Sequence, residues 1–239
     1  MTLGCSSSLK NIHLFKPNRE RRTGIFRSPT SCFLALYQRG GWGWQPFIFL
    51  MLSPFLFWGA YFSNVDFTWL SEQLTAQFQQ IDPKQIELLE PNTLMASAII
   101  NDVFNRFATL LLLSLWFLLA TKASKQQYGY WKWFAASSAI LFPAVLGDIA
   151  SYASLLLKHG EVMTYAADLN SLNGLLKLPL TNEWSHFASS LPLLLPWYIV
   201  LGYGVVLTWT EFERGQALVI SSLPWIAFYV IWALYIVIT

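Results

Sequence analysis

Long runs of apolar residues alternate with shorter polar connections along this chain of 239 residues. A helix needs about 20 largely apolar residues to cross the hydrocarbon core of a bilayer, within a range of roughly 17 to 25. Five segments meet or approach this length, at residues 44–62, 104–121, 133–157, 191–208 and 218–238. The pattern therefore predicts an all-α integral membrane protein with five transmembrane helices.

The polar connections carry shorter helical patterns of their own. Residues 1–27 are polar and basic and form a leader, and residues 28–239 form the five-span membrane domain. In residues 28–39, Ser28 and Pro29 suit a helix start, and the apolar side chains that follow share one face, which predicts an N-terminal helix lying in the membrane interface. Between the first two spans, the spacing of Phe67, Leu70, Leu74 and Phe78 predicts an amphipathic helix, and residues 81–91 read as a second short helix.

Composition agrees with a membrane location. Hydrophobic residues make up 55% of the chain and charged residues only 12%, whereas a soluble domain carries about twice that charged fraction. The net charge of +2 is too small to indicate a nucleic-acid partner. Cys5 and Cys32, the two cysteines, both precede the first span, so no disulfide framework is expected.

The basic residues are distributed unevenly over the connections. Eleven of the fifteen lie in the leader and in the second and fourth connections, against four on the other side. Since cytoplasmic loops carry an excess of Lys and Arg, the N-terminus is predicted to be cytoplasmic. An odd number of spans then places Thr239 in the periplasm or outside the cell, and the expected location is a bacterial inner membrane.

Polar side chains inside the spans are the candidate site residues. The second span opens with Asn101, Asp102, Asn105 and Arg106, and Asp148 is the acid that lies well inside the third span. Ionisable groups within a membrane usually face a partner or a cavity. We expect Arg106 and Asp148 to pair and fix the helix packing. A proton or ion relay and an unpaired position in a wet groove are the alternatives.

A further polar stretch, "DLNSLN", precedes the fourth span. It contains Asp168, Asn170 and Asn173. We expect Asp168 to cap a short helix that ends at Leu176, docked on the bundle by leucines at helical spacing, with both asparagines on its other face. The leucines are Leu169, Leu172, Leu175 and Leu176. A contact with a partner or ligand is the alternative.

Catalytic and metal-binding patterns are weak. Glu183 and His186 form a single E-x-x-H, whereas a dinuclear site in a helical bundle needs a second copy and further carboxylates. The sequence contains no nucleophile motif and no phosphate-binding loop. We therefore expect no enzyme activity, no metal, no cofactor and no small-molecule substrate.

Several short motifs resemble the Yip family, the Ypt/Rab-interacting-protein-like membrane proteins, in its bacterial branch. They are "IFRSPTSCFLALYQRGGWGWQPFIFL" at the entry to the first span, "GYWKWFAASSAILFPAVLGDI" in the third, "DLNSLN" before the Pro-bearing fourth, and "WTEFERGQALVISSLPWI" before the last. The resemblance covers residues 26–239. The acidic, proline-bearing leader of the eukaryotic members is missing, which argues against GTPase binding.

The resemblance implies a non-enzymatic accessory or scaffold subunit of a larger inner-membrane complex, because some bacterial relatives accompany ABC-type exporters. The expected partners are membrane lipids and other integral membrane proteins, an ABC-type exporter among them. Two alternatives stay open. One is a small transporter or channel subunit with a polar path near Arg106 and Asp148. The other is a lipid-binding or membrane-shaping protein that works through the basic leader and the interfacial helix.

Overall fold

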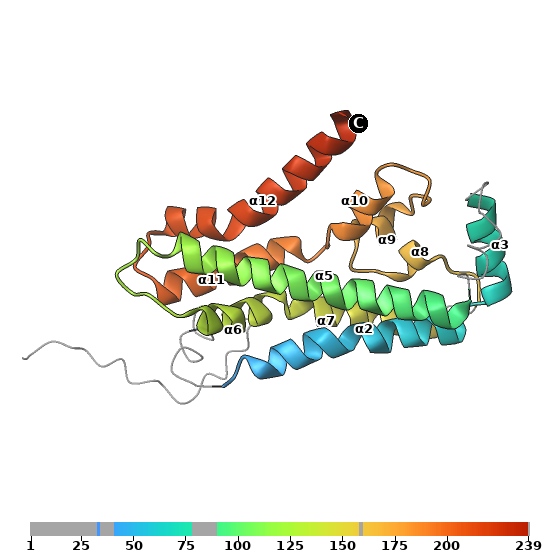
Figure 1. Ribbon diagram of the computed structural model, residues 1–239, viewed down its shortest axis with the longest axis horizontal. Helices are drawn as coiled ribbons and strands as arrows, with labels where there is room; N and C mark the ends of the chain where they lie inside the picture. Colours follow the sequence, from blue (N-terminus) through green and yellow to red (C-terminus); the bar gives the residue numbers. More distant parts are fainter. Residues whose placement is uncertain (1–32, 34–40, 78–89, 158–159, 239) are drawn as a thin grey trace, which may run out of the picture.

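The computed structural model describes Phe33 and residues 41–77, 90–157 and 160–238, and in these residues the chain is helical (Figure 1). Two isolated β-bridges, Val65 with Gly160 and Ser171 with Pro192, complete the regular structure of that part. The helices are α2 (Trp44–Asn64), α3 (Phe67–Gln77), α5 (Pro91–Ala120), α6 (Tyr130–Leu141), α7 (Pro143–Leu157), α8 (Thr164–Ala167), α9 (Leu172–Leu176), α10 (Ser185–Ser190), α11 (Leu195–Trp209) and α12 (Arg214–Ile238).

Four helical segments are long and apolar enough to cross a membrane: α2, α5, the combined α6 and α7, and α12. They match four of the five predicted spans. The second is longer than predicted, because α5 begins at Pro91, in the first turn where proline is tolerated, and runs for 30 residues. The third bends at Phe142, directly before Pro143, which cannot donate the helical hydrogen bond of that turn.

The fourth predicted span, residues 191–208, differs most from expectation. The structure has α11, a helix of only 15 residues, preceded by an irregular stretch and the short α10. The backbone leaves the helical path here because it bonds to another segment: Leu193 donates its N–H to the Asn170 carbonyl at 2.7 Å, and Leu191 accepts from Leu172 at 2.9 Å. Length and composition alone therefore identify four spans rather than five.

The long helices lie side by side, and the connections gather at two ends (Figure 1). One end carries residues 41–43, 121–129 and 210–213, and we call it the basic end for its Lys122, Lys125 and Arg214. The opposite end carries α3, the start of α5 and the end of α7, and we call it the acidic end. Figure 1 shows the second half of α12, beyond Pro224, leaning away from the bundle. There it contacts α10, through a 2.8 Å hydrogen bond from the Tyr229 hydroxyl to the Ser190 carbonyl.

The buried apolar side chains form two clusters. The larger, toward the basic end, is built around Trp133, Phe117 and Trp209, with Trp133 stacked on Phe117 at 5.5 Å between ring centroids. The smaller, toward the acidic end, includes Phe57, Tyr61 and the α3 residues Leu70 and Leu74. The amphipathic helix predicted from Phe67, Leu70, Leu74 and Phe78 is confirmed as α3 over residues 67–77, and Phe78 lies outside the described residues. The interfacial helix (apart from Phe33), the basic leader and the helix predicted at residues 81–91 (apart from Glu90 and Pro91) lie outside the described residues.

Candidate functional site

A cluster of charged groups lies between the two apolar clusters, centred on Arg106 of α5. Its Nε donates to Asp102 Oδ1 at 2.8 Å, one turn earlier on the same helix. Its two Nη atoms donate to the Asp148 carboxylate of α7, at 2.7 and 2.9 Å. The predicted pairing of Arg106 with Asp148 is present, and Asp102 is the second carboxylate that the guanidinium binds.

Ser53 of α2 brings a third helix into the cluster. Its hydroxyl donates to Asp148 Oδ2 at 2.5 Å and accepts from Arg106 Nη1 at 3.0 Å. On the far side, the Trp58 indole N–H donates to Asp102 at 3.2 Å. Arg106, Asp102 and Asp148 together carry a formal charge of −1, from one positive and two negative groups, and the Ser53 and Trp58 donors face the excess negative charge. Sequence inspection missed Ser53 and Trp58 because a lone serine or tryptophan in a span gives no signal.

The cluster is deep in the bundle. Ser53 lies near the midpoint of α2, and Asp148 is only 6% exposed. Asn101 and Asn105, which the sequence grouped with these residues, are exposed and stay outside the cluster. The reason is helical geometry: positions 102 and 106 share a face at i, i+4, whereas 101 and 105 are turned about 100° from it.

The "DLNSLN" segment packs against the same helix as Asp148. Ser151 of α7 accepts the Leu169 backbone N–H at 2.9 Å. Gly147 allows the close approach, because a Cβ at that position would lie 2.7 Å from the Asn170 side chain. The non-helical backbone of this segment has its hydrogen-bond partners in α7 and in residues 191–193.

The expected cap of the short helix is wrong. The helix α9 begins at Leu172 with Ser171 as its N-cap, and the Ser171 hydroxyl accepts from Gly174 N at 3.0 Å. Asp168 instead follows α8 and forms a local turn, in which Oδ1 accepts the Asn170 N–H at 2.8 Å. The leucine prediction also fails at the end of α9, where Leu175 and Leu176 are 62% and 55% exposed. The face of α9 that is buried carries Asn173 and Gly174, so the prediction that Asn173 lies on the face away from the bundle is also wrong.

Asn173 joins α9 to α10. Its side chain is fully buried, and its amide donates to the hydroxyls of Ser185 at 3.2 Å and Ser189 at 3.0 Å. Its oxygen accepts the Leu178 N–H at 2.8 Å. These bonds give Asn173 a structural role inside the segment that returns to the bundle.

Asp168 is partly buried beside the charged cluster. The pKa of Asp168 is raised to about 6, chiefly by burial and to a smaller extent by the Asp148 and Asp102 carboxylates. The Asn170 N–H and the Arg106 charge act in the opposite direction on the same pKa. The charge of Asp168 therefore responds to mildly acidic pH.

The chemistry available in the described part of the chain is that of a packed polar network. Among those residues, no group of three or more His, Cys, Asp or Glu side chains could hold a metal ion. Glu183 and His186 are both exposed on the chain around α10. The guanidinium and carboxylates of the cluster bond to one another and to neighbouring donors, which suits a role in holding helices together.

The fold and this network define a multi-pass helical membrane protein with a buried ionic cluster. The profile of the Yip1 domain matches residues 23–235, so the chain belongs to the Yip family. The resemblance of the span motifs to that family is thereby confirmed. No curated protein matches the chain, and no solved structure matches it.

Proposed function

We propose that the protein is a non-enzymatic accessory or scaffold subunit of a larger complex in a bacterial inner membrane. The observation that supports this most is the saturation of the charged cluster: Arg106 uses Nε and both Nη atoms in bonds to Asp102, Asp148 and Ser53. A group that carries protons or ions along a pathway needs hydrogen-bonding positions that are open to the transported species. A cluster with this many internal hydrogen bonds instead fixes the mutual position of three helices.

We further propose five crossings, with the N-terminus in the cytoplasm and the C-terminus outside. The crossing that adds to the four long helical segments is the fourth along the chain, and it consists of α10, residues 191–194 and α11. Its irregular stretch can lie in a membrane because its backbone has hydrogen-bond partners within the protein. The distribution of charge supports the orientation. Lys122, Lys125, Lys132 and Arg214 lie at the basic end, and the acids Asp66, Glu72, Glu90 and Glu161 lie at the acidic end.

A partner is expected among integral membrane proteins, and an ABC-type exporter is the class that the family resemblance suggests. Purification of the tagged full chain in mild detergent, followed by mass spectrometry, tests this proposal. A membrane protein recovered in a fixed ratio supports it. An isolated homogeneous oligomer that conducts ions in liposomes, with flux abolished by Asp148→Asn, contradicts it and favours a transporter or channel.

A further inference from the structure

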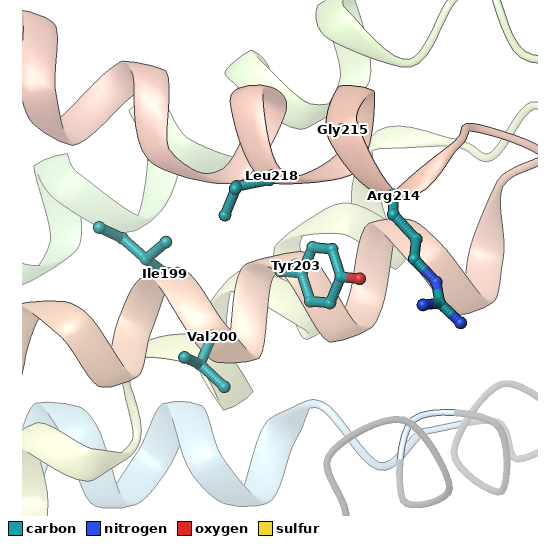
Figure 2. Close-up of a pocket in the computed structure, with 6 residues that line it drawn as sticks. All are labelled: Ile199, Val200, Tyr203, Arg214, Gly215 and Leu218. Atoms are coloured by element: carbon teal, nitrogen blue, oxygen red, sulfur yellow. The ribbon is translucent and has the colours of Figure 1, made fainter.

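An open groove of about 280 Å³ lies between α11 and α12 near the basic end, and none of its lining residues belongs to the charged cluster (Figure 2). Its lining residues are Ile199, Val200, Tyr203, Arg214, Gly215 and Leu218. Gly215 of α12 lines the groove, and an added Cβ at this position would meet no atom within 4 Å.

The two kinds of lining residue are separated along the groove. Ile199, Val200 and Leu218 supply aliphatic walls, and Val200 and Leu218 are 43% and 51% exposed. Tyr203 and Arg214 supply the polar end: Figure 2 shows the tyrosine hydroxyl pointing toward the side on which the guanidinium lies. Among the described residues, neither of these polar groups has a hydrogen-bond or ion-pair partner.

The depth of each part follows from helix geometry. Arg214 is the first residue of α12, and Trp209 is the last of α11, so in the proposed topology both lie at the membrane boundary of the basic end. At 1.5 Å per residue, Ile199 lies about 15 Å deeper than Trp209, close to half of a hydrocarbon core of about 30 Å. The polar end of the groove is therefore at headgroup level, and its apolar walls reach the middle of the bilayer.

We propose that this groove binds an anionic glycerophospholipid of the leaflet at the basic end, with the phosphate at Arg214 and Tyr203 and an acyl chain along Ile199, Val200 and Leu218. The guanidinium is the side chain best suited to phosphate oxygens, and the phenol adds a neutral donor. Two acidic residues precede Arg214 in the chain. Glu211 is paired with Lys125 at 3.6 Å, and the backbone N–H of Glu213 donates to the Gln216 side chain at 3.2 Å. This lipid site does not depend on the scaffold role, but it rests on the proposed crossing of α11.

The test uses the full chain in detergent, titrated with phosphatidylglycerol or phosphatidylcholine and followed by native mass spectrometry. The wild type is expected to bind its first lipid molecule about fivefold more tightly when that lipid is phosphatidylglycerol than when it is phosphatidylcholine. This ratio corresponds to the attraction between one basic group and an anionic headgroup. Arg214→Gln should abolish that preference, and Gly215→Leu, which fills the groove, should weaken both lipids.

Two matched variants serve as controls. Lys122→Gln removes an exposed positive charge at the same end, and Ile226→Phe adds bulk to an exposed position of α12 outside the groove. Both should bind lipid as the wild type does, and an excess of inorganic phosphate should not displace the bound lipid. Equal affinity for the two lipids in the wild type overturns the proposal. So does an equal effect of Arg214→Gln and Lys122→Gln.

Discussion

Arg106 shows how a single charged side chain is made stable inside a membrane protein. Its guanidinium binds one carboxylate of its own helix and one of α7, and Ser53 of α2 completes the set. Removing one member of such a buried group leaves the others without partners, which costs more than the group contributes as a whole. The arginine is the shared member, so its loss should do the most damage.

The first prediction is that Arg106→Leu destabilises the protein by about 3 kcal/mol or more, and more than Asp148→Leu does. Arg106→Leu leaves two carboxylates unpaired, whereas Asp148→Leu leaves the guanidinium bound to Asp102. The Arg106→Leu/Asp148→Leu double variant should be more stable than the sum of the two single losses predicts. Thermal unfolding in detergent measures all three, and Asn105→Leu, on an exposed face of α5, is the control with little expected change. Strict additivity would contradict direct pairing.

The second prediction concerns Asp168. Its pKa is about 6 in the folded protein, against an ordinary value of 3.8, so between these values the folded state binds more protons than the unfolded state. Stability must then fall as pH rises from about 4 to about 6. Asp168→Asn keeps an oxygen that can accept the Asn170 N–H, and it should remove this contribution to the pH dependence of stability. The measurement is the difference in melting temperature between variant and wild type over pH 4 to 7. If the melting temperature of the variant does not increase relative to that of the wild type as pH rises, the raised pKa of Asp168 does not affect stability.

At the scale of elements, the approach of the "DLNSLN" segment to α7 depends on a position without a side chain. Gly147 faces Asn170, and the neighbouring turn of α7 offers Ser151 to the Leu169 N–H. Since residues 191–193 bond to the same segment, its position also decides where α11 can begin.

The third prediction follows from a pair of glycines. Gly147→Ala should lower the melting temperature, because the new methyl group would meet the Asn170 side chain at 2.7 Å. Gly59→Ala, in the interior of α2, should leave it unchanged or raise it, because its Cβ meets no atom within 4 Å and alanine favours helix by roughly 0.5–1 kcal/mol. The two substitutions are chemically identical, so any difference reports the packing. Equal responses would show that the segment does not dock at Gly147.

Hydrophobic length predicted most of the helices but could not place the fourth span. Residues 191–208 are apolar throughout, yet the backbone around Pro192 bonds to a segment some twenty residues earlier, which no local pattern reveals. The Arg106–Asp148 pair was predictable because charge is rare in a span and the two positions lie at similar depth on antiparallel helices. Asp102 lies one helical turn before Arg106, at i, i+4, and binds the same guanidinium for that reason. Ser53, Trp58 and the Ser171 cap required the tertiary structure.

At the scale of the whole molecule, the distribution of charge matches the order of the helices. Basic residues gather at the end of the bundle that holds the 121–129 and 210–213 connections. This agreement between the described connections and the basic leader supports the proposed orientation.

The fourth prediction is therefore about sidedness. In a chain with Cys5 and Cys32 replaced by serine, single cysteines at Gln127 and Glu213 should resist a membrane-impermeant thiol reagent in intact cells. Single cysteines at Glu72 and Glu161, and one added after Thr239, should react. Permeabilised cells provide the control, in which all five must label. Protection of the cysteine after Thr239 would contradict a fifth crossing.

The backbone bridge between Ser171 and Pro192 also sets an order in time during biosynthesis. Lipid offers no partner to the free N–H and C=O groups of this stretch, so it cannot enter the bilayer before the α7 surface around Gly147 and Ser151 exists. In the proposed topology the newly made chain first translocates residues 160–190, and the 168–173 segment returns to α7 once the preceding helices have assembled. We expect a protease added on the acidic side to cut nascent chains there until that return is complete, and mature protein to resist it.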